Sequence, residues 1–143
     1  MKINYKTTKA LKKECAEFAA SAAAEDFAAY SSAELQEQLK KPDLKPVTLA
    51  ALVSEVIYRL KGIRLFQSQL QAAYSLFGGH ITELATGEGK TLAGVVAAVL
   101  FAKSGRTVHI LVFNDYLAQR DAAENREIFE FCGLTVGCIT EHT

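Results

Sequence analysis

Hydrophobic residues recur every three or four positions through much of the first half of the chain, which is the spacing of one buried helix face. Leu11, Cys15 and Phe18 show this spacing near the start. Further along, Ser31 followed by Glu34 forms the pattern of a capping box at a helix start. The pattern therefore predicts four helices before residue 80. They span residues 8–30, about 32–40, about 48–61 and 67–77.

Beyond residue 80 the pattern changes to short apolar runs separated by helical segments. The runs have the length of strands and span residues 80–85, 108–113 and 134–140, with helices predicted at 90–104 and 116–131. The second run, VHILVF, is apolar throughout, as in a strand covered on both faces. Alternation of strands and helices is typical of a parallel sheet with right-handed crossovers. We therefore predict an α/β fold with a partial parallel sheet in β-α-β-α-β order, preceded by N-terminal helices.

A glycine-bearing turn stands between the first predicted strand and the helix that follows it. A strand, such a turn and a helix start, in that order, are the context of a P-loop, the phosphate-binding loop of NTPases. Glycines let backbone N–H groups approach phosphate oxygens, Lys90 can reach the β- and γ-phosphates, and the Thr91 hydroxyl can bind Mg²⁺. Lys90 and Thr91 are therefore the catalytic candidates, with Thr91 as the magnesium ligand. The predicted loop comprises Thr86, Gly87, Glu88, Gly89, Lys90 and Thr91.

This loop departs from the usual pattern at one position, because Leu84 occupies the place of the first expected glycine. An alternative interpretation is a helix entry that happens to contain two glycines and a lysine. Glu88 invites a catalytic role, but a solvent-facing loop residue is the simpler interpretation.

The composition narrows the class of protein. Lys and Arg together number 16, as do Asp and Glu, so no overall basic field favours nucleic acid. No apolar run approaches the roughly 20 residues of a membrane span, and no secretory signal is visible. The three cysteines and three histidines are scattered, which argues against a disulfide framework or a metal cluster and favours reduced thiols in the cytosol.

Several motifs together resemble the SecA preprotein-translocase motor, a RecA-like ATPase. They are TGEGKTL from residue 86, NDYLAQRD at 114–121 and EFCGLTVG at 130–137, together with IRLFQSQL at 63–70, which resembles the adenine-side motif. The resemblance covers about residues 31–140. It implies that Gln69 hydrogen-bonds the adenine edge, that Arg64 and Phe66 line the base, and that residues 86–91 hold the phosphates of ATP or ADP with Mg²⁺. Residues 114–121 would then lie near the coupling surface and away from the phosphates.

The resemblance also implies a function for the whole motor. It would couple ATP hydrolysis to the passage of preproteins through a SecY-type membrane channel. The motor would act from the cytoplasmic side of the plasma membrane, and it could form oligomers. We expect residues 1–62 to be a helical segment packed on the nucleotide-binding domain. Residues 63–143 would be the incomplete first part of that domain, and the chain alone would not be catalytically competent. Departures from the family pattern suggest a divergent or accessory member. They are Gln67, Ala72, Ala73, His80 and Phe113.

Three other functions fit parts of the sequence. A nucleic-acid helicase shares the glutamine motif and the loop, but acidic residues on both sides of Arg120 disfavour contacts with a phosphate backbone. A small P-loop kinase would use Asp115 as its magnesium carboxylate, although Asp115 is more simply a residue at a helix start. A nucleotide-binding module without hydrolysis is the third alternative, because the chain offers no confident carboxylate to position a water.

Overall fold

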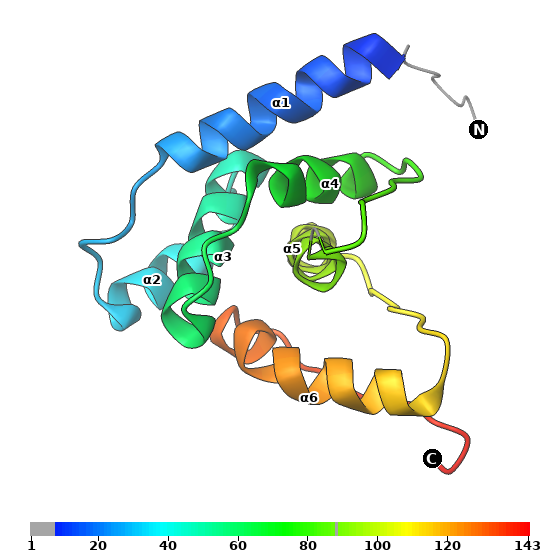
Figure 1. The fold of residues 1–143 in the computed structure, drawn as a ribbon. Coiled ribbons are helices and arrows are strands. Elements are labelled where there is room, and N and C mark those ends of the chain that lie inside the picture. The colour runs from blue at the N-terminus through cyan, green and yellow to red at the C-terminus, as the bar shows by residue number, and fades with distance from the viewer. Residues whose placement is uncertain (1–7, 88) are drawn as a thin grey trace.

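The computed structural model describes residues 8–87 and 89–143, and its regular secondary structure there is helical (Figure 1). Figure 1 looks along α5, with α1 and α4 on one side of it and α6 on the other. No helix in these residues is both long enough and apolar enough to cross a lipid bilayer. The helices are α1 (Thr8–Ala24), α2 (Ser32–Leu39), α3 (Pro46–Lys61), α4 (Gln67–Phe77), α5 (Lys90–Lys103) and α6 (Asp115–Phe131).

The predicted helices are confirmed, and most of their ends follow from local chemistry. The Ser31 hydroxyl accepts from the Glu34 N–H at 3.1 Å, and the Glu34 carboxylate accepts from the Ser31 N–H at 2.6 Å, which completes the predicted capping box. Gly62 ends α3 in the left-handed region, at φ 68°. At α6, the Asn114 side chain accepts from the Leu117 N–H at 2.9 Å.

Helix α1 ends earlier than the predicted residue 30. The guanidinium of Arg59, on α3, donates to the backbone carbonyls of Phe27 and Tyr30 at 3.2 and 2.5 Å. The Phe27 carbonyl also accepts from the Tyr30 N–H at 3.0 Å, so residues 27–30 form a turn that Arg59 holds against α3. The rings of Phe27 and Tyr30 meet edge to face, 5.2 Å apart. A tertiary contact thus overrides the helical pattern of this segment.

One hydrophobic core takes residues from all six helices. Phe18 from α1 stacks on Tyr74 of α4 with ring centroids 4.4 Å apart. Leu52 on α3, Val96 on α5 and Ile128 on α6 are fully buried. Burial of each such side chain contributes about 1.5–3 kcal/mol. The shared core fixes the axis of α5, and therefore the position of the loop that precedes it.

The predicted parallel sheet is wrong for this structure, because the described residues contain no strand. Segments 80–85, 108–113 and 134–140 are extended, yet no backbone hydrogen bond among the described residues joins any two of them. Strands exist only as paired ladders, so an extended segment without a partner is not a strand. Segment 134–140 instead runs back along α6 (Figure 1), where Arg126 donates to the Val136 carbonyl at 2.9 Å.

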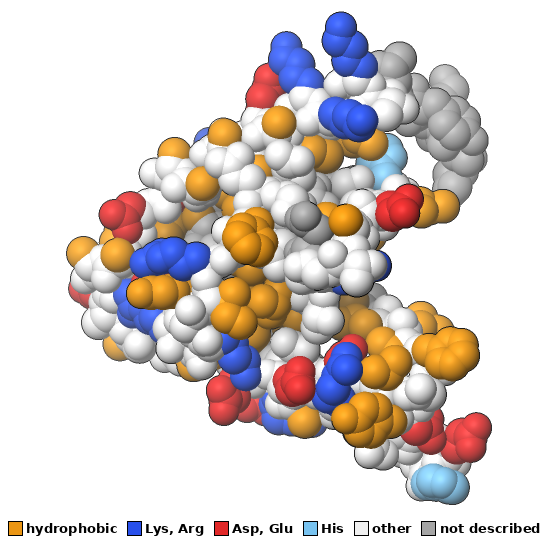
Figure 2. All heavy atoms as spheres, viewed as in Figure 1, with side chains coloured by type: hydrophobic (Ala, Val, Ile, Leu, Met, Phe, Trp, Pro, Cys, Tyr) orange, Lys and Arg blue, Asp and Glu red, His pale blue; other side chains and the backbone are white. Residues whose placement is uncertain are grey.

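The exposure of these segments explains why the apolar pattern was misleading. Exposed and partly buried residues alternate along 134–140, as expected when an extended backbone lays one face on helices. The run 108–113 is not covered on both faces, since Leu111 is 89% and Phe113 is 93% exposed. Figure 2 shows hydrophobic side chains at the surface around the start of α6. The helices therefore cover one side of these segments, and the other side is open.

Candidate functional site at the start of helix α5

The first turn of α5 has the features that bind an anion. Its N-cap is Gly89, at φ 74° and ψ 51°, and no side chain caps the helix start. The first N–H groups of a helix have no partner within the helix and carry positive potential. Lys90 and Thr91, the first two residues of α5, are both exposed. This turn therefore combines backbone donors, an ammonium and a hydroxyl at one accessible place.

The loop itself turns back toward α4. Thr86 and Gly87 form an exposed turn, with Gly87 at φ 85°, and a β-carbon built on Gly87 would meet nothing within 4 Å. Glu88 lies outside the described residues. At Gly89 a β-carbon would overlap the amide nitrogen of Gln69. The loop therefore leaves open space at its first glycine and is tightly packed at its second.

A hollow of about 260 Å³ lies beside the loop, between α4 and α5. Lys90 lines it together with Glu83 and Thr82 from the extended segment before the loop. The Thr82 hydroxyl donates to the Ser75 hydroxyl on α4 at 2.8 Å, which fixes that segment against the helix. Lys90 thus stands between the uncapped helix start and a space whose lining is mostly apolar, with Thr82 and Glu83 as its other polar residues.

The three residues predicted for the adenine side have different surroundings. Gln69 is 3% exposed and bonds both the Phe66 N–H and the Gly89 carbonyl. The Phe66 side chain is 64% exposed. Arg64 places its guanidinium over the ring of Tyr58, 3.7 Å from the centroid, in a cation–π contact. The structure therefore joins Phe66, Gln69 and Gly89 and leaves Arg64 apart, on Tyr58. Nothing in the sequence pattern had indicated Tyr58.

The start of α6 has a side-chain cap and an acidic first turn, both of which disfavour an anion. Asn114 caps the helix, and the Asp115 carboxylate accepts from the backbone N–H of Glu141 at 3.1 Å. Arg120 bonds the adjacent Asp121 at 2.6 and 3.0 Å, and this bond raises the pKa of the Arg120 guanidinium. Asp115 is thus a residue of the first helical turn, as the simpler interpretation had it.

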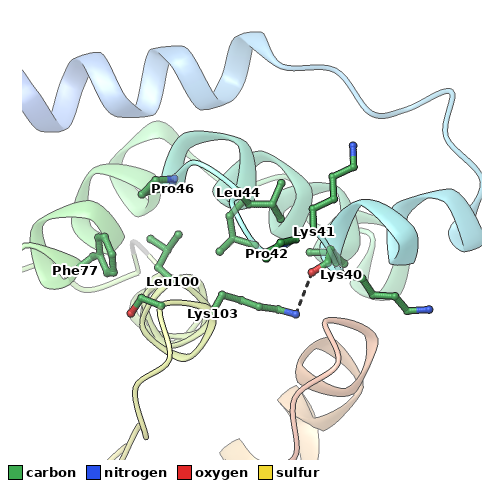
Figure 3. Close-up of a pocket in the computed structure, with 11 residues that line it drawn as sticks. Lys40, Lys41, Pro42, Leu44, Pro46, Phe77, Leu100 and Lys103 are labelled. Carbon is green, nitrogen blue, oxygen red and sulfur yellow. Dashed lines mark hydrogen bonds between the residues drawn. The ribbon is translucent and has the colours of Figure 1, made fainter.

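A second hollow, of about 200 Å³, lies between the α2–α3 connection and α5 (Figure 3). Pro42, Leu44 and Leu100 face it, whereas Lys40 points away from it. The Lys103 ammonium, which is also part of its lining, donates to the Leu39 carbonyl at 3.1 Å. The Lys103 cation is therefore engaged in holding α5 to the end of α2.

The whole chain, residues 1–143, matches the SecA DEAD-like domain family. It belongs to that family, as the sequence motifs had predicted.

Among its relatives is the protein translocase subunit SecA 2 of Mycobacterium leprae, which is 50% identical over 90 residues, 63% of this chain and 12% of that protein. The protein translocase subunit SecA of Acinetobacter baylyi is 49% identical over 89 residues, 62% of this chain and 10% of that protein. A SecA 3 of Mycolicibacterium vanbaalenii is 47% identical over 90 residues, 63% of this chain and 12% of that protein. The matched region is therefore about a tenth of the length of these relatives.

Proposed function

We propose that this chain is the ATP-binding portion of a SecA-type motor, which couples ATP hydrolysis to the passage of preproteins across a membrane. The observation that carries the proposal is the uncapped start of α5, where Lys90 and Thr91 follow a left-handed glycine. Membership of the SecA DEAD-like domain family supports the same function. The names of the relatives, protein translocase subunits, support the transport role.

Each residue of the loop has a role in this proposal. The first N–H groups of α5 bind phosphate oxygens, because they point outward from the helix and have no side-chain cap. Lys90 neutralises the β- and γ-phosphates, and Thr91 contributes a hydroxyl to Mg²⁺. The metal would be held mainly by phosphates and water, as is usual for Mg²⁺ bound with a nucleotide. Arg64, Phe66 and Gln69 are the proposed neighbours of the adenine.

Hydrolysis needs more than this loop supplies. A carboxylate that positions water and a cation that stabilises the γ-phosphate are both required. Asp115 is the carboxylate that the kinase alternative would use for magnesium. Its side chain accepts from the Glu141 N–H, and the residue begins α6. We therefore assign nucleotide binding to this chain and hydrolysis to a larger assembly. That assembly would work at the cytoplasmic face of the membrane, with preproteins and a SecY-type channel as its partners.

The helicase alternative is less well supported than the motor. Its nucleic-acid contacts would be expected after the second extended segment, in residues 114–121. There the guanidinium of Arg120 is engaged by Asp121, and Asp115 lies one turn earlier in the same helix. An arginine paired with a carboxylate is poorly placed to attract a phosphate backbone.

Calorimetric titration with Mg-ATP and Mg-ADP tests the binding site. We expect saturable binding, weakened about ten- to a hundredfold by Lys90→Ala, which corresponds to one charge-assisted hydrogen bond. Lys61→Ala is the matched control, because Lys61 is exposed at the far end of α3. Equal affinities for the protein and for Lys90→Ala, with both variants folded, would remove Lys90 from the site and contradict the proposal.

A further inference from the structure

Gln69 is one of three buried polar or charged residues in the described part of the chain, and both ends of its side-chain amide are bonded. Its oxygen accepts from the Phe66 N–H at 2.8 Å. Its nitrogen donates to the Gly89 carbonyl at 3.0 Å. Residues 66 and 69 belong to the start of α4, whereas residue 89 is the N-cap of α5. A single side chain therefore connects the beginnings of two helices.

The Gly89 carbonyl is an important attachment point. It also accepts from the Ala93 N–H at 3.3 Å, which is the first hydrogen bond within α5. The Gln69 amide nitrogen therefore bonds the same peptide group from which the helix starts. Packing around it is tight, since a β-carbon on Gly89 would overlap that nitrogen. Any shift of Gln69 would move the peptide that orients the first N–H groups of α5.

We propose that Gln69 is a positioning residue for the phosphates, in addition to any contact with the base. By holding the Gly89 carbonyl, it sets the direction of the N–H groups at the start of α5 and the position of Lys90. This inference rests on the proposed nucleotide site for its functional consequence, but the contact itself is present without a nucleotide. The consequence is that Gln69 contributes to the affinity for a polyphosphate that has no base at all.

A role limited to the base predicts a different result. An amide carries two N–H donors and two acceptor positions, so one of each could in principle face adenine. Loss of such contacts would weaken ATP and leave tripolyphosphate unaffected. Loss of the bond to Gly89 would weaken both ligands. Inorganic tripolyphosphate, with Mg²⁺, therefore separates the two roles.

The first test uses amide hydrogen exchange on the protein without any ligand. Gln69→Ala removes both hydrogen bonds, and Gln69→Glu keeps an acceptor for Phe66 but presents a carboxylate to the Gly89 carbonyl. We expect both variants to speed exchange in the segment 89–93 by roughly tenfold at the Ala93 amide, which bonds the Gly89 carbonyl, the effect of one lost hydrogen bond. Gln71→Ala, on the same helix, is the control and leaves that segment unchanged. Unchanged exchange in both Gln69 variants would overturn the proposal.

The second test measures the affinity for Mg-tripolyphosphate, Mg-ATP and Mg-GTP by calorimetry. We expect Gln69→Ala and Gln69→Glu to weaken tripolyphosphate roughly five- to tenfold, and any additional loss confined to ATP reports contact with adenine. Unchanged tripolyphosphate affinity with a loss confined to ATP would overturn the positioning role. If the unmodified protein binds none of the three, the proposed nucleotide site fails, and the exchange experiment still decides whether Gln69 orders the loop.

Discussion

Helices α5 and α6 both begin after an extended, largely apolar segment, but their first turns differ in what occupies the N-terminal N–H groups. At α6, Asn114 caps the helix and Asp115 adds a negative charge to its first turn. At α5, a left-handed glycine leads into the helix without a side-chain cap, and the first residue is Lys90. One helix start has a side-chain cap and an acidic first turn, and the other has uncapped donors and a cation available for a ligand.

This difference shows that the sequence around a helix start can be more informative than the fold class. On topology alone, the starts of α5 and α6 would have been equally good candidates for a phosphate site. The side chains distinguish them, because an acidic first turn repels the anion that a glycine and a lysine attract. The two helices approach each other at their C-terminal ends, where the Lys103 ammonium acts to lower the pKa of the Cys132 thiol.

The largest expected effect comes from adding a methyl group at Gly89. Gly62 has a similar left-handed backbone, at φ 68°, but has open space around a built β-carbon. We expect Gly62→Ala to lower the free energy of unfolding by about 1–2 kcal/mol through backbone strain alone. Gly89→Ala should cost about 3 kcal/mol, because the new methyl group also displaces the Gln69 amide. Urea unfolding of both variants measures the difference, and equal losses would show that the Gln69 contact does not matter.

A pH-dependent loss of stability is expected where the two helices end. Burial raises the pKa of the Cys132 thiol from 9.0 to about 12, although the Lys103 ammonium acts in the opposite direction. The folded state therefore favours the protonated thiol, and its stabilisation is complete below pH 9 and is lost as the pH rises toward 12. We expect this group to cost about 2–3 kcal/mol by pH 11.

Urea unfolding between pH 8 and 11 isolates this contribution. The Cys132→Ala variant should lose stability less steeply with pH, whatever constant cost its cavity adds. Cys138→Ala is the matched control, because Cys138 is only partly buried. An equally steep decline in Cys132→Ala and the unmodified protein would contradict the assignment.

A smaller effect is expected from removing the cap of α6. Asn114→Ala should lower the free energy of unfolding by about 1 kcal/mol, since the Leu117 N–H loses its acceptor. Asn114→Asp keeps an acceptor and should be close to the unmodified protein. Nucleotide affinity should be the same in all three proteins. A drop in affinity for Asn114→Ala at temperatures where it is fully folded would mean that α6 takes part in binding.

The smallest expected effect concerns Thr91 and the metal. Mg²⁺ should raise the affinity for ATP, and Thr91→Ala should reduce that increase by less than about tenfold. The effect is small because phosphate oxygens and water supply most of the metal ligands. Thr91→Ser retains the hydroxyl and should restore the gain. The comparison is made by titrating ATP with Mg²⁺ and with EDTA. A Mg²⁺ effect that is identical in all three proteins would exclude Thr91 as the ligand.

The sequence predicted the helices well because their signals are local. Ser31 with Glu34, Gly62 and Asn114 act on backbone groups within a few residues, and Ser31 with Glu34 forms the predicted capping box. The non-helical stretch after α1 was missed because Arg59, on a different helix, holds the turn at residues 27–30 through the carbonyls of Phe27 and Tyr30. No pattern within residues 8–30 reports that contact.

The sheet was predicted wrongly because pairing is not a local property. The run 108–113 has the composition of a covered strand, yet Leu111 and Phe113 are exposed and no second segment in the described residues pairs with it.

The candidate site was predictable only where its residues are neighbours in the sequence. Gly89, Lys90 and Thr91 form a local motif, whereas the bond from Gln69 to Gly89 spans 20 residues and required the structure.

The most direct test of the difference between the two helix starts is a site-resolved one. Addition of Mg-ADP to the isotopically labelled protein, followed by NMR of the backbone amides, reports on both turns in one experiment. We predict saturable shifts in the amides of Gly89, Lys90, Thr91 and Leu92, and none at the start of α6, where Asn114 already occupies the Leu117 N–H. Shifts of equal size at both helix starts, or at α6 alone, would contradict the account.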